Sequence, residues 1–597
     1  MASKKSTRLL LWITALGMLI LIATGVAVGL LVYDDTPSVA EGAWLEVRIS
    51  GSMPDGPLPD SFVLDPEQIP LTLHEYAALL HRAAEDEDIG GVFLDLDSVS
   101  MSMAAVQELR GGLAAVREAG KPCWTWSKVY DNKAWYLASA CDQIMMHPQG
   151  VPMVIGLSMT TEHYAGTFEK VGVQADYERV GTYKSAVETY EAIEPSEPSK
   201  EMYGAMLDSV FDTFITDAAV GRGLSEDALR ALINDPPITA GSALEKGMVD
   251  RLAYRDELRN DDDQLVISED ETADLVDLQD YARGLRSDWR GGDKVVAVVH
   301  LQGAIVDGKS TGGGFGGSAV VGDRSVVPML EKLAEDEDVV AVVLRINSPG
   351  GSALASDVIW RAVDKLNEEK PVVVSMGGAA ASGGYYIAMA GRHIVAQPAT
   401  LTGSIGVFAG KFAIDGLLEK VGITTWTTQR GDLAGLLSSP APFTDAERAK
   451  LRERIEDFYA TFLAKAAEGR GMTVEEVDAV AQGRVWTGAQ ALEVGLVDEL
   501  GGLELAVQRA VELAELDEDV EVGRRMLPRR STFLEALTES LNQQTAAPIK
   551  EALSAQLLPA PTLPAAVTER LDGAALLQRV LDAGGLAAFE PVRISVH

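Results

Sequence analysis

A serine and a lysine, two residue types that can together supply a nucleophile and its base, occur far apart in this chain. Ser382 lies in residues 376–387, which read MGGAAASGGYYI and lead into a predicted helix. Small residues on both sides of a serine let the backbone turn sharply and expose the N–H groups at a helix start. The hydroxyl would then stand beside a pocket that stabilises an anion. Because a free hydroxyl is a weak nucleophile, it also needs a base.

The chain contains two copies of one sequence unit. The run EDED at 85–88 reappears at 335–338, and residues 239–250 resemble residues 487–498. The offset stays close to 250 residues throughout, which predicts a tandem duplication. Equivalent positions in the two repeats can therefore be compared.

The comparison points to Lys184 as the base. Asn132 occupies the place of Ser382 in the first repeat, and Ala434 occupies the place of Lys184 in the second. One repeat has kept a serine and the other a lysine, as expected if both build one composite site. The alternative is drift at two unrelated positions, with Lys184 a surface lysine and Ser382 a helix cap.

The chemistry of such a pair sets a condition on its surroundings. A lysine near its reference pKa of about 10.4 is charged and cannot accept a proton. Burial disfavours the ammonium form and lowers this pKa. A serine–lysine pair therefore needs a dry cleft, which a joint between two domains can provide, and it needs no histidine or aspartate.

Each repeat has the pattern of an α/β domain. Residues 342–344 and 372–374 are β-branched runs typical of buried parallel strands, and residues 357–368 between them have helical spacing. This order predicts a βαβ unit. Residues 445–468 form a long amphipathic pattern that predicts a helix, capped by Thr444 and Asp445.

Four motifs, in order, carry a resemblance to a known family. They are GTYKSAVE at 181–188, NSPGGS at 347–352, ASGGY at 381–385 and LTGSIGV at 401–407. With them the chain resembles the signal peptide peptidase A (protease IV) family in its long, double-domain form. These are membrane-anchored bacterial Ser-Lys peptidases of the ClpP/crotonase-like fold class, and the resemblance covers about residues 9–514.

The resemblance implies a role for each motif. Ser382 would be the nucleophile, Lys184 the general base, and Ser404 would orient the lysine amine. The N–H of Gly383 and one from the turn that contains Gly350 and Gly351 would form the oxyanion hole. The family acts on hydrophobic peptides such as remnant signal peptides, and its assembly is a bowl-like homo-tetramer with substrate grooves inside.

The N-terminal residues predict a membrane anchor. Lys4, Lys5 and Arg8 precede an uncharged run at 9–33, long enough to cross a hydrocarbon core of about 30 Å. Basic residues before the run place the N-terminus in the cytoplasm and the rest outside, which is the periplasmic side of an inner membrane. A signal peptide cleaved after residues 38–40 is the alternative.

These patterns divide the chain into six segments. They are a basic cytoplasmic N-terminus (1–8), a transmembrane anchor (9–33), a first crotonase-like repeat (43–255), an acidic linker (256–293), a second repeat (294–514) and a tail of unassigned role (515–597).

Composition excludes several kinds of partner. The chain has 51 Lys and Arg against 89 Asp and Glu, a formal charge of −38, so we expect no nucleic-acid partner. Cys123 and Cys141 cannot form a disulfide scaffold. We expect two buried free thiols, although both could oxidise outside the cytoplasm. No ligand cluster has metal-binding spacing, so no metal or organic cofactor is implied.

Other functions compete for the same residues. His393 is a candidate for the histidine of a Ser-His-Asp triad. It lies at the start of a predicted strand at 392–396, however, so we expect a structural histidine. Residues 303–310 read GAIVDGKS, a P-loop pattern, but TGGGFGG follows where a P-loop needs a helix. A crotonase-like acyl-CoA hydratase would need neither the anchor nor the Ser382/Lys184 split. A catalytically inactive membrane scaffold is a further alternative, against which the intact Ser382, Lys184 and glycine turns argue.

Overall fold

The computed structural model describes residues 39–57, 70–285, 292, 294–312, 318–437, 440–517 and 520–529. The expected anchor at 9–33 and most of the tail lie outside these residues. Within the described ranges, no helix has the length and apolar character needed to span a membrane.

The first repeat is built on a six-stranded sheet in the order β6-β4-β3-β2-β1-β9. All its strand pairs are parallel, as the buried apolar runs predict. The strands are β1 (Ala43–Gly51), β2 (Ile89–Val99), β3 (Cys123–Asp131), β4 (Gln143–Met153), β6 (Arg251–Leu252) and β9 (Leu275–Asp277). Its main helices are α2 (Leu73–Glu85), α3 (Met103–Glu118), α4 (Asn132–Ala138) and α7 (Glu197–Arg222).

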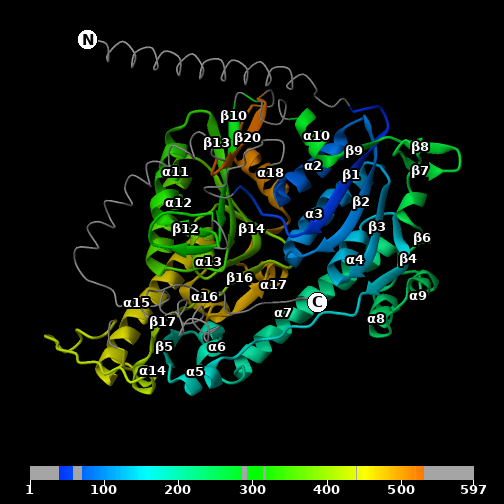
Figure 1. The fold of residues 1–597 in the computed structure, drawn as a ribbon. Helices are drawn as coiled ribbons and strands as arrows, with labels where there is room; N and C mark the ends of the chain where they lie inside the picture. Colours follow the sequence, from blue (N-terminus) through cyan, green and yellow to red (C-terminus); the bar gives the residue numbers. More distant parts are fainter. Residues whose placement is uncertain are drawn as a thin grey trace, which may run out of the picture.

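The second repeat is built on an eight-stranded sheet with the same central order (Figure 1). Its strands are β10 (Lys294–Gln302), β13 (Val339–Ser348), β14 (Val372–Ala381), β15 (His393–Ala396), β16 (Leu401–Gly403), β18 (Val485–Thr487), β19 (Glu499–Leu500) and β20 (Val522–Leu527). Its main helices are α11 (Asp323–Glu335), α12 (Ala353–Glu369), α13 (Gly383–Ala388), α15 (Asp445–Arg470) and α18 (Leu503–Leu513). The predicted βαβ unit is confirmed as β13, α12 and β14.

Each sheet extends further along the chain than the sequence indicated. The segment expected as an acidic linker contains β7 (Leu265–Ser268), β8 (Glu271–Ala273), β9 and α10 (Leu278–Gly284). β9 pairs with β1, and β20 pairs with β10 in the equivalent place of the second sheet. The acidic residues that suggested a solvated linker lie mostly in the exposed turns. Short apolar stretches between them complete the sheet edges.

The two cysteines are joined, which corrects the expectation of free thiols. Cys123 and Cys141 form a disulfide, with their Cα atoms 4.7 Å apart. Cys123 opens β3, and Cys141 lies two residues before β4, which pairs with β3. Because the parallel strands β3 and β4 begin side by side, Cys123 and Cys141 lie next to each other. Their separation of 18 residues in the sequence did not reveal this contact.

A buried cluster of charges ties the two repeats together. Arg345 on β13 is 1% exposed, and its Nη2 donates to Asp55 Oδ1 at 2.7 Å and to Glu108 Oε2 at 2.5 Å. Both carboxylates belong to the first repeat. Glu108 Oε1 also accepts the N–H of Leu503 at 2.9 Å, and Arg345 Nη1 donates to Ser375 Oγ at 2.9 Å. The guanidinium is therefore matched by acceptors from both repeats.

A small sheet crosses the joint between the repeats. β5 (Gln174–Val180) of the first repeat pairs antiparallel with β17 (Val407–Ala413) of the second, and both lie at the lower edge of the molecule in Figure 1. Arg448 on α15 reinforces the pairing by donating to Asp176 and Glu178 of β5, each at 2.6 Å. The chain that leaves β5 is thereby held against the second repeat.

The charge cluster generates a stability prediction. Arg345→Ala leaves Asp55 and Glu108 buried without their partner, which should cost about 3–5 kcal/mol. Arg361→Ala is the matched control, because Arg361 lies on the exposed surface of α12 and pairs with Asp364, so that its loss should cost at most about 1 kcal/mol. Thermal unfolding of the full chain checks both, and equal midpoints for the two variants would contradict the assigned role.

Candidate active site

Ser382 lies in a strained turn between β14 and α13. Its φ of 53° and ψ of −115° fall in a region that residues other than glycine rarely adopt, at a cost of about 1–3 kcal/mol. The Ser382 N–H donates to the carbonyl of Gly403 at 2.8 Å, which fixes the turn. Gly383 must follow, since a Cβ there would lie 2.4 Å from Ser356 Oγ. The structure thus contains the sharp strand-to-helix turn that the small residues predicted.

Lys184 reaches this turn from the first repeat. It lies four residues after the end of β5, and its Nζ lies 3.1 Å from Ser382 Oγ, across a sequence separation of 198 residues. The same Nζ donates to the carbonyl oxygen of Ser404 at 2.9 Å and lies 2.9 Å from Ser404 Oγ. The structure therefore brings together the three residues that the sequence analysis singled out.

Burial changes the acid–base character of this lysine. Lys184 is only 3% exposed, and the loss of hydration lowers the pKa of its amine to about 7. An ordinary lysine has a pKa of about 10.4 and is almost fully protonated near pH 7. The lowered pKa therefore allows a neutral Lys184 amine near pH 7.

The Lys184 loop is shaped by a second-repeat loop that the sequence analysis missed. The N–H of Tyr183 donates to the carbonyl of Gln482 at 2.7 Å. Gly483 follows, and a Cβ there would lie 2.6 Å from the Cβ and the backbone N of Lys184. Gly181 approaches Gln482 just as closely. Only a glycine at 483 permits this contact, and a lone glycine gave no signal of it in the sequence.

Ser404 also sits in an unusual backbone conformation. It lies between β16 and β17 with a φ of 51°, and its N–H donates to the carbonyl of Arg484 at 2.7 Å. The loop at 482–484 therefore holds both Lys184 and the residue that accepts a hydrogen bond from the Lys184 amine.

The glycines expected at an oxyanion hole lie beside Ser382. Gly350 and Gly351 have φ values of 104° and 153°, and a Cβ on Gly350 would lie 2.8 Å from the Gly383 nitrogen. The N–H of Gly350 donates to Ser348 Oγ at 3.1 Å. Backbone N–H groups from two separate turns therefore meet next to the serine.

Of the two rejected motifs, His393 lies apart from this arrangement, whereas the P-loop-like stretch borders it, because the N–H of Ile305 donates to the carbonyl of Gly350 at 2.9 Å. His393 Nε2 lies 3.0 Å from Glu499 Oε2, and Arg509 donates to the same carboxylate at 2.8 Å. His393 therefore contacts β19 rather than Ser382 or Lys184. In the P-loop-like stretch, residues 304–306 form a short strand, β11 (Ala304–Val306), and α11 begins only at Asp323. Among the described residues, no group of His, Cys, Asp and Glu could hold a metal ion.

Sequence comparison identifies the family. The model of Peptidase family S49 matches residues 115–267 and 364–517, once in each repeat. The chain belongs to peptidase family S49. It is therefore a serine protease with duplicated S49 domains, and the Clp protease model additionally matches residues 322–400.

Three curated relatives align with most of this S49 protease. "Serine protease SPPA, chloroplastic" of Arabidopsis thaliana is 34% identical over 472 residues, which are 78% of this chain and 69% of the relative. "Protease 4" of Salmonella typhi is 32% identical over 514 residues, 84% of this chain and 81% of the relative. "Protease 4" of Haemophilus influenzae is 31% identical over 477 residues, 77% and 76% of the two chains.

A solved structure matches a smaller part of the S49 protease. A point mutant of ClpP1 from Listeria monocytogenes aligns with a TM-score of 0.24 and 16% identity, covering 37% of this chain and 97% of that one.

The contact between Gly483 and Lys184 generates a prediction. Gly483→Ala should displace the lysine and lower kcat/KM by about 10²-fold, because errors of about 1 Å in a reacting group cost that much. Gly495→Ala is the control: Gly495 has a similar φ of 79°, but the nearest atom to an added Cβ is Met472 Sδ at 3.7 Å. Peptide hydrolysis with folded variants checks this, and equal activities would show that the contact does not position Lys184.

Proposed function

We propose that this S49 protease is a membrane-anchored endopeptidase that works outside the cytoplasm with a Ser382–Lys184 dyad. The observation that carries the proposal is the buried Lys184 amine 3.1 Å from Ser382 Oγ, with its pKa lowered to about 7. A neutral amine at this place has the right distance and the right proton affinity for a general base.

The hydrogen bonds around Lys184 favour proton transfer from the Ser382 hydroxyl to the Lys184 amine. A neutral amine has two N–H donors and one lone pair. The carbonyl oxygen of Ser404 can only accept, and Ser404 Oγ lies at the same distance of 2.9 Å. If both N–H groups are donated to Ser404, the lone pair remains for the hydroxyl proton of Ser382. Ser404 is thus a positioning residue for the base.

The reaction follows from these atoms. Lys184 takes the proton from Ser382 Oγ as that oxygen attacks the peptide carbonyl, whose electron pair moves onto the carbonyl oxygen. The resulting ammonium then gives its proton to the leaving amine as the C–N bond breaks. Water hydrolyses the acyl-enzyme with Lys184 again as the base, and the serine is regenerated.

The developing oxyanion needs donors, and two turns supply them. The Gly383 N–H opens α13 next to Ser382. Since the Gly350 N–H is already bonded to Ser348 Oγ, the Gly351 N–H is the better candidate for the second donor. Removing one such donor typically costs about 10²–10³ in rate, so this pocket would carry much of the catalysis.

The substrates and the location are proposed from the sequence. The uncharged run at 9–33 would anchor the chain, and the basic residues before it would place the protease domains on the periplasmic side. The resemblance to signal peptide peptidases favours hydrophobic peptides such as remnant signal peptides as substrates. Cell fractionation tests the anchor: the full chain should stay with membranes, a chain without residues 9–33 should not, and release of both would refute it.

A peptidase assay tests the dyad. Ser382→Ala and Lys184→Met should each lower kcat/KM on a Leu/Ala-rich fluorogenic peptide by about 10³-fold or more. Methionine keeps most of the volume of the buried lysine, so the fold should persist. His393→Ala is the control and should stay near wild type, because His393 bonds to Glu499.

The outcomes separate the alternatives. Activity that survives Lys184→Met would refute the dyad. Loss of activity in His393→Ala would support His393 as the base instead. A wild-type chain inert toward all peptides would favour the scaffold. A matched Ser/Asp-rich peptide tests the substrate class, which fails if both peptides are cut equally well.

A further inference from the structure

The short strand β11 lies along the turn that contains Gly350 and Gly351. The N–H of Ile305 donates to the carbonyl of Gly350 at 2.9 Å, and the carbonyl of Ile305 accepts the N–H of Ser352 at 2.8 Å. Gly351 lies between these two hydrogen bonds. Only a glycine fits there, because a Cβ would lie 2.1 Å from the Ile305 oxygen. The turn is therefore paired along one side with β11.

This pairing sets the direction of the Gly351 N–H. In a trans peptide unit the C=O and the N–H point in opposite directions. Since the Gly350 carbonyl points to β11, the Gly351 N–H points to the other side of the turn. In the second sheet β13 leads into the turn, with β10 on one side of it and β14 on the other. β10 continues into β11 and β14 leads to Ser382, so the N–H points to the side of the nucleophile.

The carboxylate of Asp307 connects β11 to the helix that follows the turn. It accepts a hydrogen bond from the Ser352 hydroxyl with 2.5 Å between the oxygens, a length typical of a charge-assisted bond. Ser352 Oγ in turn accepts the N–H of Ala355 at 3.2 Å and caps α12. Through Ser352, Asp307 therefore holds β11, the turn and the start of α12 in one arrangement.

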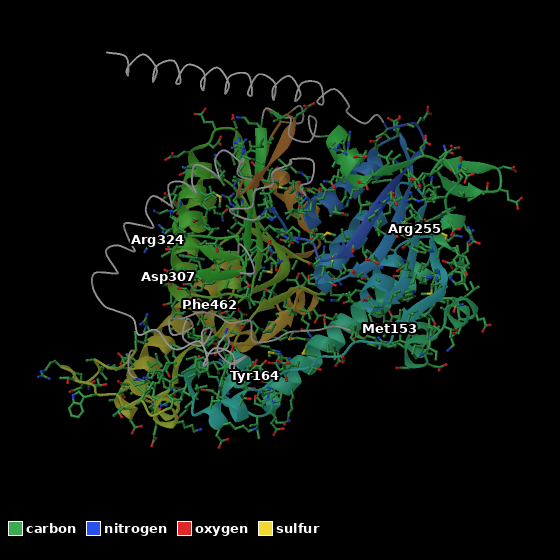
Figure 2. The ribbon with its side chains drawn as sticks, in the orientation of Figure 1. Met153, Tyr164, Arg255, Asp307, Arg324 and Phe462 are labelled. Atoms are coloured by element: carbon green, nitrogen blue, oxygen red, sulfur yellow. A yellow bond between two sulfur atoms is a disulfide. The ribbon has the colours of Figure 1, made fainter. Side chains whose placement is uncertain are left out.

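The residue after Asp307 anchors the same stretch to α11. The N–H of Gly308 donates to Asp323 Oδ1 at 2.7 Å, and the carbonyl of Gly308 accepts the N–H of Arg324 at 2.9 Å. Figure 2 shows Asp307 and Arg324 close together on the second repeat. The P-loop-like stretch thus has a structural use: it holds the far end of β11 against α11.

The first repeat has the helix cap without the aspartate. At the offset of 250 residues, Ser102 is the counterpart of Ser352, and it caps α3 by accepting a backbone N–H at 3.2 Å. Pro57 stands in the place of Asp307 and has no carboxylate to offer. A serine cap therefore needs no aspartate beside it. The bond between Asp307 and Ser352 occurs in the repeat that carries the nucleophile.

We propose that Asp307 is a positioning residue for the oxyanion hole. By holding Ser352 it keeps β11 paired with the turn, and this pairing aims the Gly351 N–H at the oxygen that becomes negative in the transition state. Asp307 acts through the turn rather than by contact with the substrate. The inference rests on the proposed Ser382 chemistry and adds a residue to it.

Kinetics of Asp307 variants on the Leu/Ala-rich peptide test this role. Asp307→Ala should lower kcat by about 10–10²-fold and leave KM within about twofold, because an oxyanion donor acts mainly in the transition state. Asp307→Asn should stay closer to wild type, since its amide oxygen can still accept from Ser352. Asp364→Ala is the control and should match wild type, because Asp364 is a surface aspartate of the same repeat that pairs with Arg361.

A pair of inhibitors separates the oxyanion hole from substrate binding. Ser382 Oγ adds to the carbonyl carbon of a Leu/Ala peptide aldehyde, and the C=O electron pair moves to the oxygen, which takes up the hydroxyl proton. That oxygen lies in the oxyanion hole, whereas the matching peptide alcohol binds without such a bond. Asp307→Ala should weaken the aldehyde by the same factor as kcat/KM and leave the alcohol unchanged. General loss of structure would weaken both.

The serine partner gives an independent test. Ser352→Ala should lower kcat at least as much as Asp307→Ala. The double variant should be no worse than Ser352→Ala alone, because the two residues act as a unit. Ser102→Ala is the matched control, since it removes the same kind of cap from α3 in the first repeat and should keep the wild-type kcat.

The outcomes distinguish this inference from the proposed function. A raised KM with an unchanged kcat in Asp307→Ala would make Asp307 a substrate contact and overturn the proposal. Equal weakening of aldehyde and alcohol would also overturn it, as would Asp307→Asn falling as far as Asp307→Ala. If Ser382→Ala is inactive while Asp307→Ala matches wild type, this inference alone fails. If Ser382→Ala stays active, the proposed function fails and this inference with it.

Discussion

The burial of one lysine amine is the constraint on which the rest of this structure depends. Lys184 can act as a base near pH 7 only if water is kept from it, because hydration stabilises the ammonium form. At the same time the amine must keep polar partners, which Ser404 and Ser382 supply within 3.1 Å. The joint between the two repeats meets both demands. The segment after β5 places the lysine on one side of the joint, and the turns at Ser382 and Ser404 contact its amine from the other side.

Duplication explains why such a joint exists in a single chain. Two α/β units with the same central strand order face each other, tied by the cluster around Arg345 and by the β5–β17 pairing. Only one combination of the duplicated halves has kept the chemical groups. In the first repeat, Asn132 uses its side chain to hold the backbone of Ile155 and Gly156. Asn132, the counterpart of the serine nucleophile, therefore holds a loop in place.

Much of this arrangement could be predicted from the sequence, because equivalent positions in the two repeats can be compared. The offset between the repeats exposed the Ser382/Lys184 split, and the β-branched runs indicated parallel sheets. The missed features have weaker local signals. Gly483 is one glycine among 57, the pairing of Cys123 with Cys141 depends on neighbouring strands, and β9 and β20 are short strands next to acidic residues. Each is defined by contacts between distant segments, which residue spacing alone does not encode.

The pH dependence of kcat/KM for one uncharged, hydrophobic peptide tests the central claim most directly. This ratio reports the ionisation of the free enzyme. With Lys184 as the base, kcat/KM is low while the amine is protonated, rises through a single apparent pKa of about 7 and is level above it. A rise that continues toward pH 10 would mean that Lys184 titrates as an ordinary, hydrated lysine, and the dry joint would not be the source of its reactivity.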